Sequence, residues 1–261
     1  MFCYWQNNSI VVSRSDLLCS NLPESFHDFN IVQISDLHNK RFGPQLIEHI
    51  IALEPDIIVI TGDLIDRRRF DLDSALAFIE EAADIAPIYY VSGNHEAWSG
   101  KFEQIKQQLL AYGVHVLDDE FVTILEHDAS ITLYGLSDPA FLTSSYIDGT
   151  NLSNVIEHLE NWSDDEGFKI LLSHRPEFFD LYVDHHMDLV FTGHAHGGQI
   201  RLPFVGGLIA PNQGWFPKVT SGAFTDGETT MYVSRGLGNS AFPLRLFNRP
   251  EIVSVTLKTK E

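Results

Sequence analysis

Short apolar runs recur along the chain and predict two kinds of element. Five runs of the buried-strand type cover residues 31–35, 56–61, 87–92, 168–173 and 188–192. Apolar residues three and four positions apart predict helices at residues 44–53, 73–83, 100–111 and 152–159, the third between a capping Ser99 and Gly113. Strand and helix alternate through the first half, so we expect three βα units and a parallel sheet.

The pattern changes after residue 120. Residues 121–125 and 130–135 read as a β-hairpin, since two strand-like runs flank a short polar connection. Further strands are expected at residues 9–13, 199–202, 229–234 and 252–257, the first of them at a sheet edge. Two sheets packed face to face with helices outside are the simplest arrangement. We expect one domain over 1–261, in which 1–30 form an edge strand and a loop.

Charged or polar residues, chiefly Asp, His and Asn, follow each of the five buried runs. In chain order they are Asp36 and His38; Asp63, Asp66 and Arg67; Asn94 and His95; His174; and His194 and His196. In an open α/β sheet, ligands bind outside the carboxyl ends of the strands, so these loops are expected to converge on one crevice. Taken singly, each residue could be a helix cap or a turn residue. Together they predict a metal site.

The ordered set of motifs carries a resemblance. Asp-x-His at 36–38, Gly-Asp-x-x-Asp-Arg at 62–67, Gly-Asn-His-Glu at 93–96, the lone His174 and Gly-His-x-His at 193–196 resemble the calcineurin-like metallophosphoesterase superfamily. The later stretches 197–203, 210–217 and 235–239 resemble its bacterial YkuE/YaeI-type branch, which is often membrane-anchored and is associated with phosphodiesterase activity. This resemblance implies a four-layered α/β/β/α sandwich with two mixed β-sheets.

The resemblance also implies roles for these residues. The implied ligands are Asp36, His38 and His196 for one metal ion and Asn94, His174 and His194 for a second, with Asp63 bridging both. His95 would protonate the leaving group or stabilise the transition state, Asp66 would be its partner, and Arg67 would hold a phosphate oxygen. Arg68 and Arg69 read as a solvated basic run. Ligands without thiolate suit Mn, Fe or Zn better than Ca or Mg, and Mn is our first choice.

Composition excludes several classes of protein. A net charge of -19 argues against nucleic-acid binding, which usually needs a basic surface, and two cysteines exclude a disulfide framework. No apolar run approaches the roughly 20 residues that span a bilayer. The chain as given is expected to be soluble. The sequence leaves open its oligomeric state, and whether it is cytoplasmic or held at a membrane by an anchor before residue 1.

The leading function is therefore a dinuclear metal-dependent phosphoesterase. It would hydrolyse a phosphodiester, or a phosphorylated small molecule or lipid, by attack of a metal-bridging hydroxide. One alternative is a protein phosphatase, suggested by Asp66 and Arg67. Another is a catalytically silent metal-binding scaffold, although no expected ligand is missing.

Residues 200–250 are predicted to form a loop region on the substrate side. Residues 201–250 carry five basic residues against two acidic ones in a strongly acidic chain, and their aromatic residues lie among glycines and prolines. The aromatic side chains could cap the second sheet. Alternatively, Trp215 and Phe216, with Arg235, could form a wall of the cleft that meets a lipid-linked phosphate ester. The second reading also predicts peripheral contact with a membrane.

Overall fold

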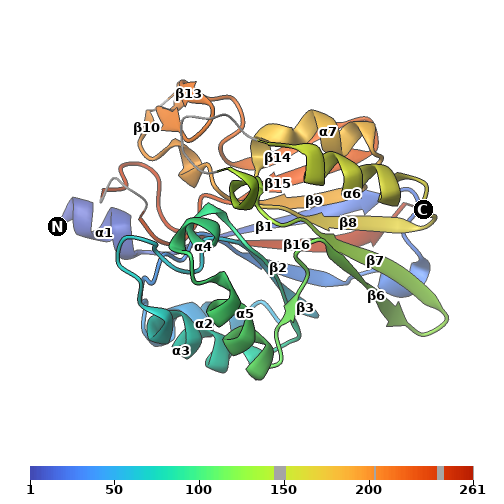
Figure 1. The fold of residues 1–261 in the computed structure, drawn as a ribbon, viewed down its shortest axis with the longest axis horizontal. Helices are drawn as coiled ribbons and strands as arrows, with labels where there is room; N and C mark the ends of the chain where they lie inside the picture. The colour runs from blue at the N-terminus through green and yellow to red at the C-terminus, as the bar shows by residue number, and fades with distance from the viewer. Residues whose placement is uncertain (144–150, 203, 240–243, 261) are drawn as a thin grey trace.

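Two six-stranded sheets lie face to face in the computed structural model, which describes residues 1–143, 151–202, 204–239 and 244–260 (Figure 1). The first sheet has the order β1-β16-β2-β3-β4-β5. Its strands are β1 (Val11–Cys19), β2 (Asn30–Ile34), β3 (Ile57–Thr61), β4 (Ile88–Val91), β5 (His115–Val116) and β16 (Glu251–Thr259). β2 to β5 are mutually parallel, as the βα pattern predicts, and β16 runs antiparallel to β2.

The second sheet has the order β14-β15-β9-β8-β7-β6. Its strands are β6 (Glu120–Glu126), β7 (Ala129–Gly135), β8 (Phe168–Leu172), β9 (Leu189–Thr192), β14 (Gly222–Asp226) and β15 (Thr229–Val233). The four central strands are parallel, and an antiparallel hairpin closes each edge. Both sheets are therefore mixed.

Helices cover the outer face of each sheet and complete the predicted four layers (Figure 1). The first sheet is covered by α2 (Pro44–Ile51), α3 (Leu72–Ala83) and α5 (Phe102–Ala111), and the second by α6 (Ser153–Ser163) and α7 (Phe179–Asp184). Two further helices are α1 (Phe2–Asn8) and α4 (Asn94–Ser99), and 3-10 turns lie at Glu24–Phe26, Pro139–Leu142, Pro176–Phe178 and His196–Gly198. No helix in the described ranges is long and apolar enough to cross a membrane.

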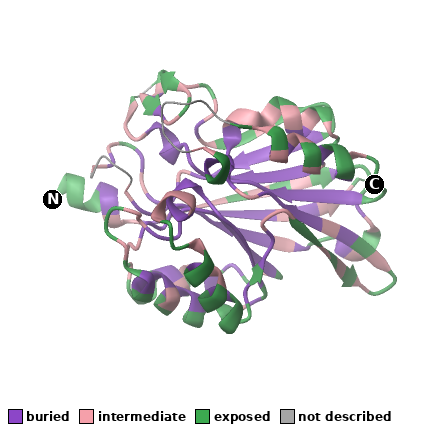
Figure 2. Ribbon diagram, in the orientation of Figure 1, coloured by how far each residue is buried: buried purple, intermediate pink, exposed green. Residues whose placement is uncertain are grey.

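The apolar runs are continuous because their strands are buried on both faces. In β3, Ile58 and Ile60 pack under the helices, while Ile57 and Val59 pack between the sheets. This alternation follows from the two-residue period of a strand. Figure 2 shows the result, with buried strands inside and exposed outer faces on the helices.

Several boundaries differ from the sequence prediction. β1 runs to Cys19 because Leu17 and Cys19 pack between the sheets, so the expected loop to residue 30 is shorter. Ser99 does not cap the next helix; it ends α4, and Gly100 then turns with a φ of 66°. Gly113 ends α5 as predicted, with a φ of 78°.

The segment after β9 is mostly irregular. The strand predicted at residues 199–202 shrinks to β10 (Arg201–Leu202), which pairs with β11 (Gly206–Gly207). A second small hairpin joins β12 (Ile209–Ala210) to β13 (Gly214–Trp215). We call residues 201–202 and 204–216 the hairpin lobe; Figure 1 shows its strands β10 and β13 standing out from the sandwich, far from the β6–β7 hairpin.

Candidate metal centre and active site

The loops after β2, β3, β4, β8 and β9 converge at one end of the two sheets, as the sequence predicts. All seven predicted ligands are buried there: Asp36, His38, Asp63, Asn94, His174, His194 and His196. Five of them have a positive φ, namely Asp36, His38, Asp63, His194 and His196. Such conformations cost of order 1–3 kcal/mol each and cluster at functional sites. Their concentration here indicates a centre held in place by its surroundings.

The first group of possible ligands contains Asp36, His38, Asp63 and His196, whose donor atoms all lie within 4.8 Å of one another. The Nε2 atoms of His38 and His196 are 3.1 Å apart. His196 Nε2 is 3.2 Å from Asp36 Oδ1, and His38 Nε2 is 3.6 Å from Asp63 Oδ2. Two buried ring nitrogens this close need a shared proton or cation, so this group fits a metal ion.

The second group contains Asp63, His174 and His194. We include Asn94 in it, because its Oδ1 lies next to His174. His174 Nε2 lies 3.1 Å from His194 Nδ1 and 3.2 Å from Asn94 Oδ1. The Nδ1 atom of His174 is 2.7 Å from the carbonyl oxygen of Thr61, to which its N–H can donate. A histidine held in this way presents its other nitrogen to a metal ion.

Asp63 connects the two groups through one oxygen. Its Oδ1 accepts the backbone N–H of His95 at 2.8 Å. Its Oδ2 faces both groups, at 3.6 Å from His38 Nε2 and 3.4 Å from His174 Nε2. Asp63 Oδ2 therefore faces both groups, as a ligand that bridges two metal ions must.

Burial and charge set the protonation of these groups. Burial lowers the pKa of His38 to about 3 and those of His194 and His196 well below their ordinary value. Burial also disfavours the charged form of His174, but the carboxylates of Asp63 and Asp36 outweigh it and raise its pKa to about 10. Without metal, the centre thus holds three neutral imidazoles and one imidazolium that pairs with Asp63.

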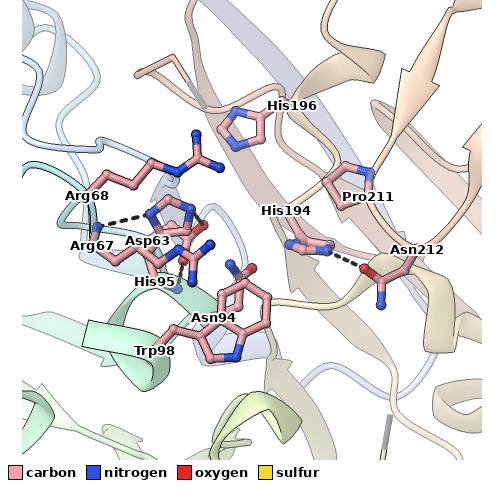
Figure 3. A pocket seen from close by; sticks show the side chains of 10 residues that line it. All are labelled: Asp63, Arg67, Arg68, Asn94, His95, Trp98, His194, His196, Pro211 and Asn212. Carbon is pink, nitrogen blue, oxygen red and sulfur yellow. Dashed lines mark hydrogen bonds and ion pairs between the residues drawn. The ribbon is translucent and has the colours of Figure 1, made fainter. Parts of the chain in front are cut away.

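The centre opens into a cavity of about 510 Å³ (Figure 3). Its lining consists of Asp63, Arg67, Arg68, Asn94, His95, Trp98, His194, His196, Pro211 and Asn212. Arg67 lies over the Trp98 ring, with 4.8 Å between its guanidinium carbon and the ring centroid. Arg68 is exposed, as expected of a solvated basic run, and it also lines the cavity.

His95 and its predicted partner lie together at the cavity wall. Its Nδ1 accepts the backbone N–H of Arg67 at 3.2 Å. Asp66 Oδ1 is 3.8 Å from that nitrogen, which is an ion-pair distance rather than a hydrogen bond. In the neutral ring the proton is therefore on Nε2, which lies 4.0 Å from Asp63 Oδ2.

The hairpin lobe contributes differently from what the sequence predicts. Pro211 and Asn212 reach the cavity, and Asn212 Oδ1 is 3.4 Å from His194 Nε2. Trp215 and Phe216 are not in its lining and are 68% and 60% exposed, so they do not cap the second sheet either. Arg235 lies 3.5 Å from Glu251 and lines a separate cavity of about 200 Å³.

Sequence reasoning missed Trp98, Pro211 and Asn212. Trp98 lies one helical turn after Asn94, so a helix starting at Asn94 would have placed both on one face. Pro211 and Asn212 belong to the stretch 210–217 that carries the branch resemblance. Their position at the cavity is decided by the turn between β12 and β13.

The geometry agrees with what comparison with known proteins finds. The family described as calcineurin-like phosphoesterase matches residues 29–198, a span that holds all seven predicted ligands. The chain belongs to this family. It is therefore a metal-dependent hydrolase of phosphoric esters, and its buried Asp and His cluster fits the divalent metals that the family uses.

Relatives of this phosphoesterase cover nearly the whole chain. It is 32% identical to the uncharacterized metallophosphoesterase YkuE of Bacillus subtilis, over 98% of this chain and 88% of YkuE. It is 30% identical to the phosphodiesterase YaeI of Escherichia coli, over 88% of this chain and 82% of YaeI. Among solved structures, TT1561 of Thermus thermophilus matches with a TM-score of 0.54 and 14% identity, over 80% of this chain and 90% of TT1561, and so supports the fold.

Asp63→Asn should weaken metal binding by both groups together, because Asp63 faces both. Elemental analysis of protein purified without chelator measures this. Asp56→Asn is the control, since Asp56 precedes the same strand at its other end and accepts the N–H of Asn30. Loss of one ion with full retention of the other would contradict a shared ligand.

Metal binding to the metal-free phosphoesterase should release protons from His174. Its pKa of about 10 lies above the ordinary 6.5, so the charged form is present at neutral pH and must lose its proton to bind a cation. Between pH 7 and 9 we expect about one proton per molecule and metal affinity that rises about tenfold per pH unit. Calorimetry in buffers of different ionisation enthalpy counts the protons; no release in this range would contradict the assignment.

Proposed function

We propose that this phosphoesterase acts at a dinuclear centre on a phosphodiester or on a phosphorylated small molecule or lipid. The observation that carries the proposal is the position of Asp63 Oδ2 between His38 Nε2 and His174 Nε2, which belong to different ligand groups. Asp36, His38 and His196 would hold one ion, and Asn94, His174 and His194 the other.

Two bound divalent ions would supply Lewis acidity toward phosphoryl oxygens and a lowered pKa for a water between them. The donor set of imidazole, carboxylate and amide suits Mn, Fe or Zn, and Mn is the ion to test first. A scaffold without catalysis would be expected to lack ligands, whereas every ligand of the proposed centre is present and buried.

We assign His95 the role of proton donor to the leaving oxygen. Its Nδ1 is occupied by the Arg67 N–H, so its proton is on Nε2 at the cavity. A ring that donates from Nε2 as an imidazolium also carries a proton on Nδ1, and in that form Nδ1 would face the Asp66 carboxylate, 3.8 Å away, instead of accepting the Arg67 N–H. General acid catalysis of this kind contributes typically 10²–10⁴-fold.

Arg67 and Arg68 are suited to bind the substrate phosphate. Both line the cavity from the loop after β3, and a guanidinium donates to phosphate oxygens as a planar fork (Figure 3). The cavity of about 510 Å³ is much larger than a phosphate group and leaves room for the organic part of an ester. The name of the relative YaeI, a phosphodiesterase, favours a diester.

A lipid-linked ester fits the hairpin lobe. The lobe exposes Leu202, Phe204, Val205, Ile209, Trp215 and Phe216. The same lobe brings Pro211 and Asn212 to the cavity, so an apolar chain that leaves the cavity beside them could contact these side chains. Exposed aromatic groups also favour peripheral contact with a lipid surface.

The test of the function is turnover of a chromogenic phosphodiester and of the matching monoester, each with and without added Mn²⁺. We expect Mn²⁺-dependent hydrolysis with a higher kcat/KM for the diester. Hydrolysis of neither ester under any metal condition would count against a catalytic role. Preference for the monoester would count against the diester assignment.

His95→Ala should reduce turnover by roughly 10²–10⁴-fold and leave metal content near that of the wild type, because His95 belongs to neither proposed ligand set. Asp66→Asn should reduce turnover less, since Asp66 acts on the reaction through His95. His115→Ala is the control, because His115 is exposed and stacks on Tyr89. Unchanged turnover in the first variant would remove His95 from the mechanism.

Substituting Trp215 and Phe216 together by serine should raise KM for a long-chain phosphodiester and leave a small chromogenic diester unaffected. Both side chains are exposed, so the melting temperature should stay unchanged. A matched control replaces Phe121 and Leu125, which are exposed on the distant β6, by serine. Equal losses on both substrates would contradict a contact with the lipid portion.

A further inference from the structure

Glu96 is a buried carboxylate to which the proposed mechanism gives no role. It stands at the third position of α4, directly after Asn94 and His95, and its exposed fraction is 0%. It belongs to neither group of metal ligands and does not line the cavity. A buried carboxylate is costly unless hydrogen bonds compensate for the lost water, so its partners explain its presence.

The carboxylate accepts three backbone N–H groups from two loops. Oε2 accepts from Asp63 and from Gly93, both at 2.8 Å, and Oε1 accepts from Ile65 at 3.0 Å. In return, Asp63 Oδ1 accepts the N–H of His95 at 2.8 Å. Two carboxylates thus each bind the backbone of the other's loop; we call these four hydrogen bonds the clamp.

The clamp acts on the residue that links the two ligand groups. It holds the backbone N–H of Asp63, whose φ of 52° is unfavourable for a residue with a side chain. It also holds Oδ1, which leaves Oδ2 facing His38 and His174. Both the strained backbone and the direction of the carboxylate therefore depend on it.

Close approach of the two loops requires glycine at position 93. A Cβ there would lie 2.6 Å from the backbone nitrogen of Asp63, which is closer than real Cβ atoms come to another atom. The missing side chain of Gly93 allows the approach, and Glu96 binds the loops once they meet. Gly93 and Glu96, three residues apart in the chain, therefore act together to hold the two loops close.

We propose that Glu96 is a positioning residue, which holds Asp63 Oδ2 at the place where the centre binds its metal ions. The proposal deepens the dinuclear function proposed above and rests on it. It predicts that loss of the Glu96 carboxylate weakens metal binding even though Glu96 touches no ion.

Three variants test this. Glu96→Leu removes every acceptor of the clamp on this side. Glu96→Gln can keep its oxygen toward Asp63 and Gly93 and turn its amide toward Ile65, so it retains two of the three bonds. Asp118→Asn is the matched control, because Asp118 also accepts a backbone N–H near the end of β4, from Ser92 at 2.7 Å, but has no bond to Asp63.

The measurements are the Mn²⁺ dissociation constant of the metal-free protein and its melting temperature. Changes around a metal's ligands typically cost 10–100-fold in affinity, so we expect about that loss for Glu96→Leu, a smaller one for Glu96→Gln and none for Asp118→Asn. Excess Mn²⁺ should restore turnover in the Glu96 variants. If Glu96→Leu does not fold, a weakened Mn²⁺ affinity in folded Glu96→Gln still supports the proposal.

Two results would overturn the proposal. In one, a Glu96 variant melts at a lower temperature but binds Mn²⁺ with wild-type affinity, which would make the role purely structural. In the other, Asp118→Asn weakens Mn²⁺ binding as much as Glu96→Leu. Failure of the dinuclear function itself is seen separately, as fewer than two ions in the wild type, and does not alter the comparison among variants.

Discussion

The centre depends on burying two carboxylates and four imidazoles in one small volume. Asp36 and Asp63 are at most 1% exposed, and the four histidines of the two groups at most 7%. Isolated charges in such a place are expensive, so they must be neutral or paired. Burial keeps three imidazoles neutral and leaves them as ligands for a cation. The same burial that opposes charge without metal thus favours metal binding.

Two buried arginines, Arg175 and Arg245, add positive charge next to the acidic side chains of the centre. Arg175 pairs with Asp138 through two bonds of 2.6 and 2.8 Å, and its Nη1 lies 3.0 Å from His194 Nε2. Arg245 is 1% exposed and donates to the carbonyl oxygens of Gly238 and Arg235. Burial lowers its pKa to about 10, which still leaves it charged at neutral pH. Each guanidinium group thus lies beside a histidine of the two groups, since Arg245 Nη2 is 3.5 Å from His196 Nδ1.

In the proposed reaction, metal binding and substrate binding depend on different parts of the structure. The proposed ligands lie at the ends of strands whose side chains fill the core, so their positions depend on the stability of the sandwich. The cavity wall comes from loops and short elements, with Arg67 and Arg68 after β3, Trp98 on α4, and Pro211 and Asn212 in the hairpin lobe. This arrangement separates the binding of metal, which needs fixed geometry, from the choice of substrate, which depends on loops.

The sequence by itself determined the two sheets and the edge at which the predicted ligands meet. Buried strands give continuous apolar runs, and the carboxyl ends of parallel strands meet at one edge, so the sequence alone places Asp36, Asp63 and His174 together. Tertiary structure decided which Asp63 oxygen faces both groups and that Glu96 binds two loops. It also placed Arg68 in the cavity and left Trp215 exposed. These features depend on the directions of side chains and on loops that are distant in the chain but meet in space. The local sequence of a hairpin does not decide whether it packs on a sheet or stands away from it.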